Sequence, residues 1–215
     1  MGKNKTVVIA NPNAPTGLYM GLSDIEDIVK SNPKSVVIID EAYVDFGGQS
    51  AVGLIKKYDN LLVTGTFSKS RSMAGARLGF GFGCQSLIAD INTLRYSTNP
   101  YNVNRMTCEA GKAALASREY YDENCKKIIE SREWTERELE KLGFETTGSH
   151  ANFVFAKSDR ISGKELYLKL KQKGVLVRHF DKQRICQYNR ITVGTAEQMK
   201  ILLEKIKEIF EEENL

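Results

Sequence analysis

The sequence has few of the residues that build metal sites and disulfide frameworks. Its 215 residues include only four cysteines and two histidines. The cysteines are scattered and form no C-x-x-C pair (Cys84, Cys108, Cys125 and Cys186). This pattern favours reduced thiols in a cytoplasmic protein, and it predicts neither a disulfide framework nor a metal site. No apolar run reaches membrane-spanning length and no signal peptide opens the chain, so we expect no membrane association.

The sequence also lacks a concentrated charge of one sign and a phosphate-binding loop. The net charge of +4 is spread along the chain, and residues 118–142 mix both signs as solvated helix faces do, so we expect no nucleic-acid partner. Each Gly-Lys pair (at 2–3, 111–112 and 163–164) is followed by a residue other than Ser or Thr, so the G-x-x-x-x-G-K-[ST] loop is absent. Nucleotide hydrolysis would therefore need a phosphate cradle outside this sequence.

The first half of the sequence alternates apolar runs with helical segments. Strands are expected at 6–10, 36–40, 61–66 and 77–83, and a Ser23–Glu26 capping box predicts a helix that ends before Asn32. This rhythm is typical of an α/β fold with a mostly parallel sheet. Long helices are expected at 103–117 and 119–142.

A smaller α+β unit is expected to follow. It contains strands in "ANFVFA", "VLVRHF" and "RITVG", a helix capped by Ser162 with Glu165, and a last helix that starts at a Thr195–Gln198 capping box. The two histidines, His150 and His179, are interpreted as ordinary surface or turn residues. We place the boundary between a large domain (1–118) and a small domain (119–215).

Three consecutive strands end in polar residues, in "NPNAPTG", "DEAY" and "GTFSKS". If these strands are parallel, their carboxyl ends share one edge of the sheet, which is where open α/β sheets bind ligands. Taken alone, Asp40 and Glu41 could be a magnesium-and-water pair or could face another ligand. The glycines of "GFGFG" alternate with Phe inside a strand and do not open a helix, so a dinucleotide fingerprint is not expected.

These segments carry a resemblance to a known family. "NPNAPTG", "VVIIDEAYVDF" and "TGTFSKSRSMAGARLGFGFG", in this order and spacing, resemble the fold-type-I aminotransferases that use pyridoxal 5'-phosphate (PLP), in particular the histidinol-phosphate aminotransferase subgroup. "SHANFVF", "GVLVRHF" and "NRITVGTAEQ" extend the resemblance to the C-terminus. The resemblance implies the PLP-dependent transferase (aspartate-aminotransferase-like) fold, with a truncated large-domain sheet and a small C-terminal domain.

The resemblance also implies roles for particular residues. Lys69 would form the Schiff base with PLP and move the substrate proton. Asp40 would pair with the protonated pyridine nitrogen and not with magnesium, and Tyr43 would donate a hydrogen bond to the ring 3'-oxygen. Glu41 is interpreted as structural.

The anionic groups of cofactor and substrate have candidate partners as well. Arg77, with the hydroxyls of Thr66 and Ser68, would hold the cofactor phosphate, because a guanidinium and hydroxyl donors suit a dianion. Arg190 would take the substrate carboxylate, and Arg178 is a weaker candidate for the substrate's anionic end.

The sequence departs from the family pattern in two places. Ala14 stands where relatives have an Asn that contacts the 3'-oxygen; either Tyr43 makes that contact alone or Asn13 replaces it. Relatives also carry a long N-terminal part that supplies phosphate donors, an aromatic that stacks on the cofactor ring and a tyrosine for the neighbouring subunit. We therefore expect a C-terminal fragment that binds PLP weakly or not detectably and self-associates.

The implied activity is transamination, between glutamate and imidazole-acetol phosphate, by a cytoplasmic homodimer acting on small molecules. Two alternatives stay open at this point. One is another PLP reaction on the same fold, such as decarboxylation of a phosphorylated amino acid, and the other is a non-catalytic fragment.

Overall fold

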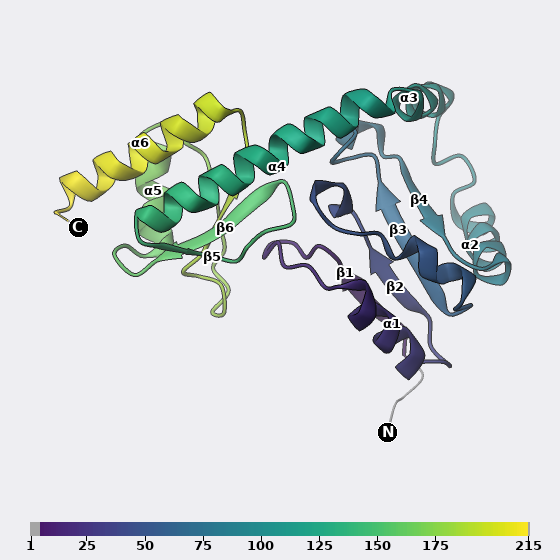
Figure 1. Cartoon of the computed structure of the whole chain (residues 1–215). Coiled ribbons are helices and arrows are strands. Elements are labelled where there is room, and N and C mark those ends of the chain that lie inside the picture. The colour runs from purple at the N-terminus through teal and green to yellow at the C-terminus, as the bar shows by residue number, and fades with distance from the viewer. Residues whose placement is uncertain (1–4, 215) are drawn as a thin grey trace. The chain divides into compact units, whose positions relative to one another are not determined.

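The computed structural model describes residues 5–214, and the chain divides into two compact units. The first unit comprises the residues up to Asn13 together with Tyr19–Asn124, and the second comprises Ala14–Leu18 together with the residues from Cys125 onward. Helix α4 (Arg118–Lys141) runs continuously from the first unit into the second (Figure 1). The boundary after residue 118 therefore stays a prediction.

A four-stranded sheet forms the centre of the first unit. Its order is β1-β2-β3-β4, with β1 at Val7–Ala10, β2 at Val37–Asp40, β3 at Leu61–Thr66 and β4 at Gly79–Phe82. The first three strands are parallel and β4 is antiparallel to β3. The predicted mostly parallel sheet is confirmed, and Figure 1 shows the four strands side by side.

The core of this unit lies between the sheet and α1 (Leu22–Ser31). Ile25 and Val29 of α1 pack with Val37 and Ile39 of β2, and all four are fully buried. Ala51 and Leu54 of the 3-10 segment η2 (Ala51–Lys56) join the same cluster. Strands β2 and β3 are therefore anchored by apolar contacts, and the polar residues at their carboxyl ends project from a fixed support.

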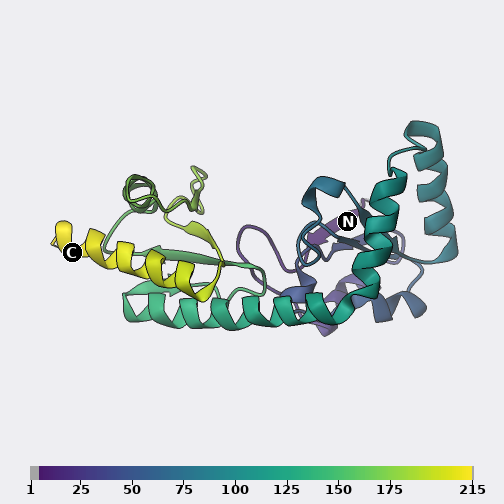
Figure 2. The same cartoon turned by 90° about the horizontal axis from the view of Figure 1, so that it is seen from above.

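The β4 edge of the sheet is much more exposed. Every residue of β4 is exposed, and α2 (Gln85–Thr98), which the sequence interpretation missed, has no buried residue. Figures 1 and 2 show α2 at the periphery of the first unit. Helix α3 (Arg105–Ala116) packs more closely: a Cβ at Gly111 would lie 2.5 Å from the Leu78 side chain. Close approach explains this glycine.

The second unit is built on an antiparallel sheet of order β5-β6-β8-β7. The strands are β5 (Phe144–Thr146), β6 (Phe153–Ser158), β7 (Arg178–His179) and β8 (Asn189–Thr192). Buried residues of α4, α5 (Gly163–Gln172) and α6 (Ala196–Glu212) share one apolar cluster with this sheet. The predicted α+β unit is present, although "VLVRHF" forms a strand at only two residues.

Capping explains where these helices begin. The Ser162 hydroxyl accepts from the Glu165 amide at the start of α5, and Thr195 and Gln198 form the predicted reciprocal capping box of α6. The Ser23–Glu26 box is wrong. Helix α1 begins two residues earlier than that box predicts, at Leu22, and its N-cap is Gly21, which has no side chain to accept a hydrogen bond.

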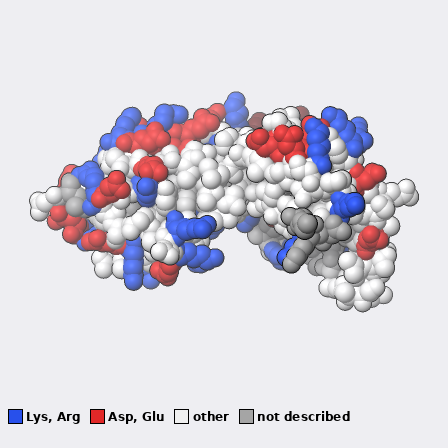
Figure 3. Space-filling view, turned by 90° about the horizontal axis from the view of Figure 1, so that it is seen from below, with Lys and Arg blue, Asp and Glu red and all other residues white. Residues whose placement is uncertain are grey.

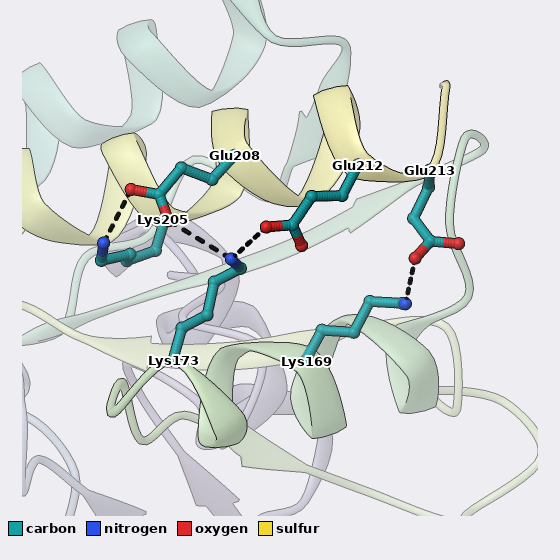
Figure 4. A network of polar contacts seen from close by, with 6 residues as sticks. All are labelled: Lys169, Lys173, Lys205, Glu208, Glu212 and Glu213. Carbon is teal, nitrogen blue, oxygen red and sulfur yellow. Dashed lines mark hydrogen bonds and ion pairs between the residues drawn. The ribbon is translucent and has the colours of Figure 1, made fainter.

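A surface network of charged side chains connects α5 with α6 (Figure 4). Lys173 lies 2.7 Å from Glu212 and 3.3 Å from Glu208, and Lys169 pairs with Glu213. Surface pairs of this kind stabilise a fold only modestly, so the apolar cluster beneath dominates. On the face drawn in Figure 3, Lys and Arg lie among Asp and Glu.

Candidate active site

The carboxyl ends of β1, β2 and β3 lie on one edge of the first unit's sheet, as the sequence predicted. Ala10 is opposite Asp40, and Asp40 is opposite Thr64 in the parallel register. Asp40 is the last residue of β2, and its Oδ1 accepts a hydrogen bond of 3.2 Å from the Ala42 amide. The half-buried carboxylate therefore belongs to a well-defined turn at the edge where such sheets bind ligands.

Tyr43 and Lys69 meet at this edge. Tyr43 is the N-cap of the short 3-10 turn η1 (Val44–Phe46), and Lys69 lies three residues beyond the end of β3. The Lys69 Nζ lies 5.2 Å from the centroid of the Tyr43 ring, a cation–π distance. Two of the three predicted catalytic residues are thus in contact although they are 26 residues apart in the sequence.

Thr66 and Ser68 form a small hydroxyl pair before the lysine. The Thr66 Oγ1 lies 2.9 Å from the Ser68 Oγ and 3.2 Å from the Leu78 carbonyl oxygen, and it accepts from the Ser68 amide at 3.0 Å. Because one hydroxyl carries one proton, it donates to only one of the two oxygens at a time. Both hydroxyls are partly buried at the end of β3.

Arg77 is exposed and belongs to the loop between β3 and β4. Its Nη1 donates to the Ala74 carbonyl at 3.1 Å, and its φ of +55° is in the left-handed region. Non-glycine residues adopt this conformation uncommonly, and such positions concentrate at functional sites. The described hydrogen bond ties Arg77 to its own turn, and its phosphate contact stays a prediction.

Glu41 has a structural role, as expected. It is 6% exposed, and its carboxylate accepts from the Ser50 hydroxyl at 2.5 Å and from the Ala51 amide at 2.6 Å. Burial raises the pKa of Glu41 above its usual value, and the two hydrogen bonds oppose that rise. Glu41 therefore fastens the start of η2 to the end of β2.

A second polar cluster next to the lysine was missed by sequence reasoning. The carboxylate of Asp45, on η1, accepts a hydrogen bond from the Ser70 hydroxyl and lies 3.8 Å from a guanidinium nitrogen of Arg71. The Arg71 guanidinium also lies 5.2 Å from the centroid of the Tyr121 ring. No motif marks this cluster, because its members are joined only by the fold.

The second unit brings the two predicted substrate arginines together. Arg178 on β7 is directly opposite Arg190 on β8, and both guanidinium groups lie near the Phe180 ring, at 5.7 and 5.9 Å from its centroid. Arg190 also lies 5.2 Å from the Phe153 ring centroid, and its buried Nε makes no hydrogen bond with the described residues. Like charges directly opposite on neighbouring strands are unfavourable unless an anion compensates them.

Two further positions bear on the sequence predictions. Interpreting His179 as an ordinary surface or turn residue was wrong: its side chain is 8% exposed, and its ring stacks on that of Tyr167 at 6.0 Å between centroids. Ala14 is exposed and lies in the segment assigned to the second unit, whereas Asn13 is partly buried. Whether Asn13 replaces the usual Asn stays open.

The donor set of the first unit fits the cofactor that the resemblance implies. A carboxylate at a strand end can pair with a ring N–H, a lysine amine can bond an aldehyde, and hydroxyl and guanidinium donors suit a phosphate dianion. Among the described residues, no three His, Cys, Asp or Glu side chains gather closely enough to hold a metal ion. Within residues 5–214, none of the helices combines the length and apolar character of a membrane span.

Comparison with known proteins identifies the family. Residues 2–206 match the family described as aminotransferase class I and II. This match extends over most of the chain and includes the sheet edge, Lys69 and both arginines. The chain therefore belongs to the class I and II aminotransferase family, and its structural relatives confirm the expected aminotransferase fold.

Individual relatives define the similarity further. The histidinol-phosphate aminotransferase of Clostridium beijerinckii is 49% identical over 204 residues, which are 95% of this chain and 57% of that protein. The structure of the histidinol-phosphate aminotransferase from Clostridium acetobutylicum has a TM-score of 0.85 at 30% identity, with 98% of this chain and 64% of that chain covered.

A third relative shows the fold alone. The histidinol-phosphate aminotransferase from Sinorhizobium meliloti, solved in complex with pyridoxal-5'-phosphate, has a TM-score of 0.83 at 23% identity and covers 95% of this chain and 58% of that chain. The chain thus spans somewhat more than half the length of the curated relatives it matches.

Proposed function

We propose that this protein is a PLP-dependent aminotransferase of the histidinol-phosphate type, which exchanges an amino group between glutamate and imidazole-acetol phosphate. One observation carries the proposal: Asp40 ends β2, Tyr43 and Lys69 follow the neighbouring parallel strands β2 and β3 at the same sheet edge, and the Lys69 amine lies over the Tyr43 ring. The relatives described above support the substrate class, because curated proteins 49% identical to this chain carry that name.

Each residue at this edge of the sheet has its own role in cofactor binding and proton transfer. When bound, PLP supplies a cationic ring that withdraws electrons from the substrate carbon. Asp40 would hold the proton on the ring nitrogen, because a carboxylate at hydrogen-bond distance favours the charged form of its partner. Lys69 would hold the cofactor through its amine and would move the substrate proton. Tyr43 would donate from its hydroxyl to the ring oxygen.

Phosphate binding falls to Thr66, Ser68 and Arg77 in this proposal. The Thr66 hydroxyl donates to the Ser68 hydroxyl at 2.9 Å, which leaves the single proton of Ser68 to donate to a phosphate oxygen. Arg77 is exposed, and its single described hydrogen bond goes to a carbonyl of its own turn. Its guanidinium therefore keeps other N–H groups with which to hold a dianion.

Substrate binding falls to the arginine pair of the second unit. Among the described residues, no carboxylate lies within ion-pair distance of Arg178 or Arg190, and the two are cross-strand neighbours. An anionic group placed between them would relieve their repulsion. We assign the substrate carboxylate to Arg190 and another anionic end of the substrate to Arg178.

We also infer a cytoplasmic homodimer. Among the described residues no two cysteines form a disulfide, which is typical of a protein from a reducing compartment. The first unit exposes large apolar side chains on β4, on α2, in the loop after α2 and at the start of α3 (Phe80, Phe82, Ile91, Leu94, Tyr96, Tyr101 and Met106). Exposed large apolar side chains in this number are typical of an interaction surface.

The test is covalent labelling of the protein with PLP. After incubation at saturating PLP and reduction with borohydride, peptide mapping should place the label on Lys69, and Lys69→Arg should abolish it. Lys112 and Lys164 serve as controls, since both follow a glycine in the sequence and lie outside the candidate site. A label that stays on either control lysine in preference to Lys69 would contradict the proposal.

A further inference from the structure

The turn that carries Tyr43 is joined to the loop that carries Lys69 by a side-chain hydrogen bond. Asp45, in η1, accepts from the hydroxyl of Ser70, the residue that directly follows Lys69. Ser70 is buried, with 7% of its surface exposed, so this bond is shielded on the donor side. A shielded hydrogen bond between side chains 25 residues apart fixes the distance between two turns.

Arg71 adds a weaker attachment on the same carboxylate. Its guanidinium lies 3.8 Å from the Asp45 Oδ2, beyond hydrogen-bond distance, and its buried Nη1 makes no hydrogen bond with the described residues. The side chain is 18% exposed and its cation faces the ring of Tyr121. Because Asp45 itself is 46% exposed, the ion pair is screened by solvent, and the Ser70 hydrogen bond is the stronger of the two attachments.

The backbone of the lysine loop needs such an external attachment. Within the loop, the Ser72 amide donates to the Lys69 carbonyl at 3.1 Å and the Met73 amide donates to the Phe67 carbonyl at 3.0 Å. These bonds shape the loop but do not fix its position relative to η1. The lysine side chain has four rotatable bonds, so its amine stays over Tyr43 only if both backbones hold still.

We propose that Asp45 is a positioning residue: by accepting from Ser70, it holds the amine of Lys69 over the ring of Tyr43. The inference rests on the proposed function, in which Lys69 is the reactive amine. Asp45 touches neither cofactor nor substrate in this account, and it acts through the residue next to the lysine. The carboxylate charge is secondary, so an amide oxygen at position 45 should suffice.

The experiment measures the reactivity of each lysine by competitive acetylation and mass spectrometry, with Lys112 of the same molecule as the internal reference. Asp45→Ala and Ser70→Ala should each change the relative rate of Lys69 by about 2- to 10-fold, the range that corresponds to one hydrogen bond. The double variant should change it no more than either single variant, because both remove the same bond. Asp45→Asn should resemble the wild type.

Asp59→Ala is the matched control, since it removes an exposed aspartate from the same unit and should leave Lys69 unchanged. The proposal is overturned if Lys69 reacts at the wild-type rate in Asp45→Ala, or if Lys69 and Lys112 both accelerate, which would show general loosening. Acetylation needs no cofactor, so the result is independent of the PLP labelling above. A PLP label on Lys112 or Lys164 in preference to Lys69, together with altered acetylation, would refute the proposed function and leave the positioning role standing.

Discussion

The two units of this chain differ in how completely they bury their own strands. In the second unit, four successive residues of β6 are buried, and three helices share one apolar cluster with the sheet. In the first unit, β2 and β3 are buried against α1 and η2, whereas every residue of β4 is exposed. The second unit is closed around its core, and the first combines a smaller core with open surface and the residues for chemistry.

The exposed strand β4 of the first unit has a regular sequence. Strand β4 reads "GFGF", and its two phenylalanines are each 45% exposed, with ring centroids 5.3 Å apart. A Cβ at Gly65 would lie 2.5 Å from the Phe80 ring, so this ring lies directly over the glycine of the neighbouring strand. The two phenylalanines therefore lie at an exposed edge of the sheet, which is part of the surface that we propose for the dimer.

The largest effect on activity should come from a substitution at the sheet edge of the first unit. Asp40→Asn should lower aminotransferase turnover by about 100-fold or more, because an amide does not keep the ring nitrogen protonated. It should leave the midpoint of thermal unfolding almost unchanged, since Asp40 is only half-buried. Steady-state kinetics and thermal unfolding of the same preparations check both parts. An activity that instead followed magnesium concentration would restore the hydrolase interpretation.

The next largest effect should be on stability, from a core substitution in the second unit. Ile206 of α6 is fully buried in its apolar cluster, so Ile206→Ala should destabilise the second unit by about 2–5 kcal/mol. Denaturant unfolding followed by the fluorescence of Trp134, the single tryptophan and a neighbour of that cluster, reports on this unit. Leu94→Ala on α2 is the control: Leu94 is 64% exposed, and its loss should change little. Equal effects of the two variants would contradict the contrast between the units.

Local signals in the sequence predicted most of this fold. Apolar runs ending in polar residues located β1 to β3, and two of three capping boxes located α5 and α6. The box at Ser23 failed because Gly21 precedes an apolar Leu22 that already belongs to the helix. Helix α2 was missed because its residues show no apolar face, and none of them is buried.

The sequence predicted some residues of the candidate site and missed others. Strand ends and the resemblance located Asp40, Tyr43 and Lys69, because each follows an apolar run directly or by a few residues. The Asp45–Ser70 bond and the opposed pair Arg178–Arg190 depend on contacts between distant segments, which no local pattern records. Periodicity predicts which residues face a core, and only the folded chain shows which polar residues meet.

A smaller effect should separate substrate binding from stability within the closed unit. Arg190→Leu should raise the KM for glutamate and lower kcat/KM by an amount equivalent to about 1.5–3 kcal/mol, the contribution of a charged hydrogen-bonded pair. Its Nε is buried and makes no hydrogen bond with the described residues, so its removal should cost the fold little. Arg160→Leu, on the same unit but away from the pair, is the control. An unchanged kcat/KM in Arg190→Leu would remove this arginine from substrate binding.

The smallest effect concerns pH and Glu136, a partly buried carboxylate of the second unit. Burial raises the pKa of Glu136, although the Ser149 amide donates to it at 2.9 Å and Arg132 is near. The folded protein therefore binds this proton more readily than the unfolded chain does, so the contribution of Glu136 to stability is full below the unfolded pKa, about 4.3, and is lost as pH rises through the folded pKa.

Glu136→Gln should remove that dependence, because the amide oxygen still accepts from the Ser149 amide and carries no charge. Unfolding followed by Trp134 fluorescence at a series of pH values should show a flatter stability profile just above pH 4.3, the usual carboxyl value, than in the wild type. Glu204→Gln removes the same charge from an exposed position of α6 and should keep the wild-type slope. Identical slopes in wild type and Glu136→Gln would mean that Glu136 titrates alike in the folded and unfolded chain, and that its burial against the closed unit carries no electrostatic cost.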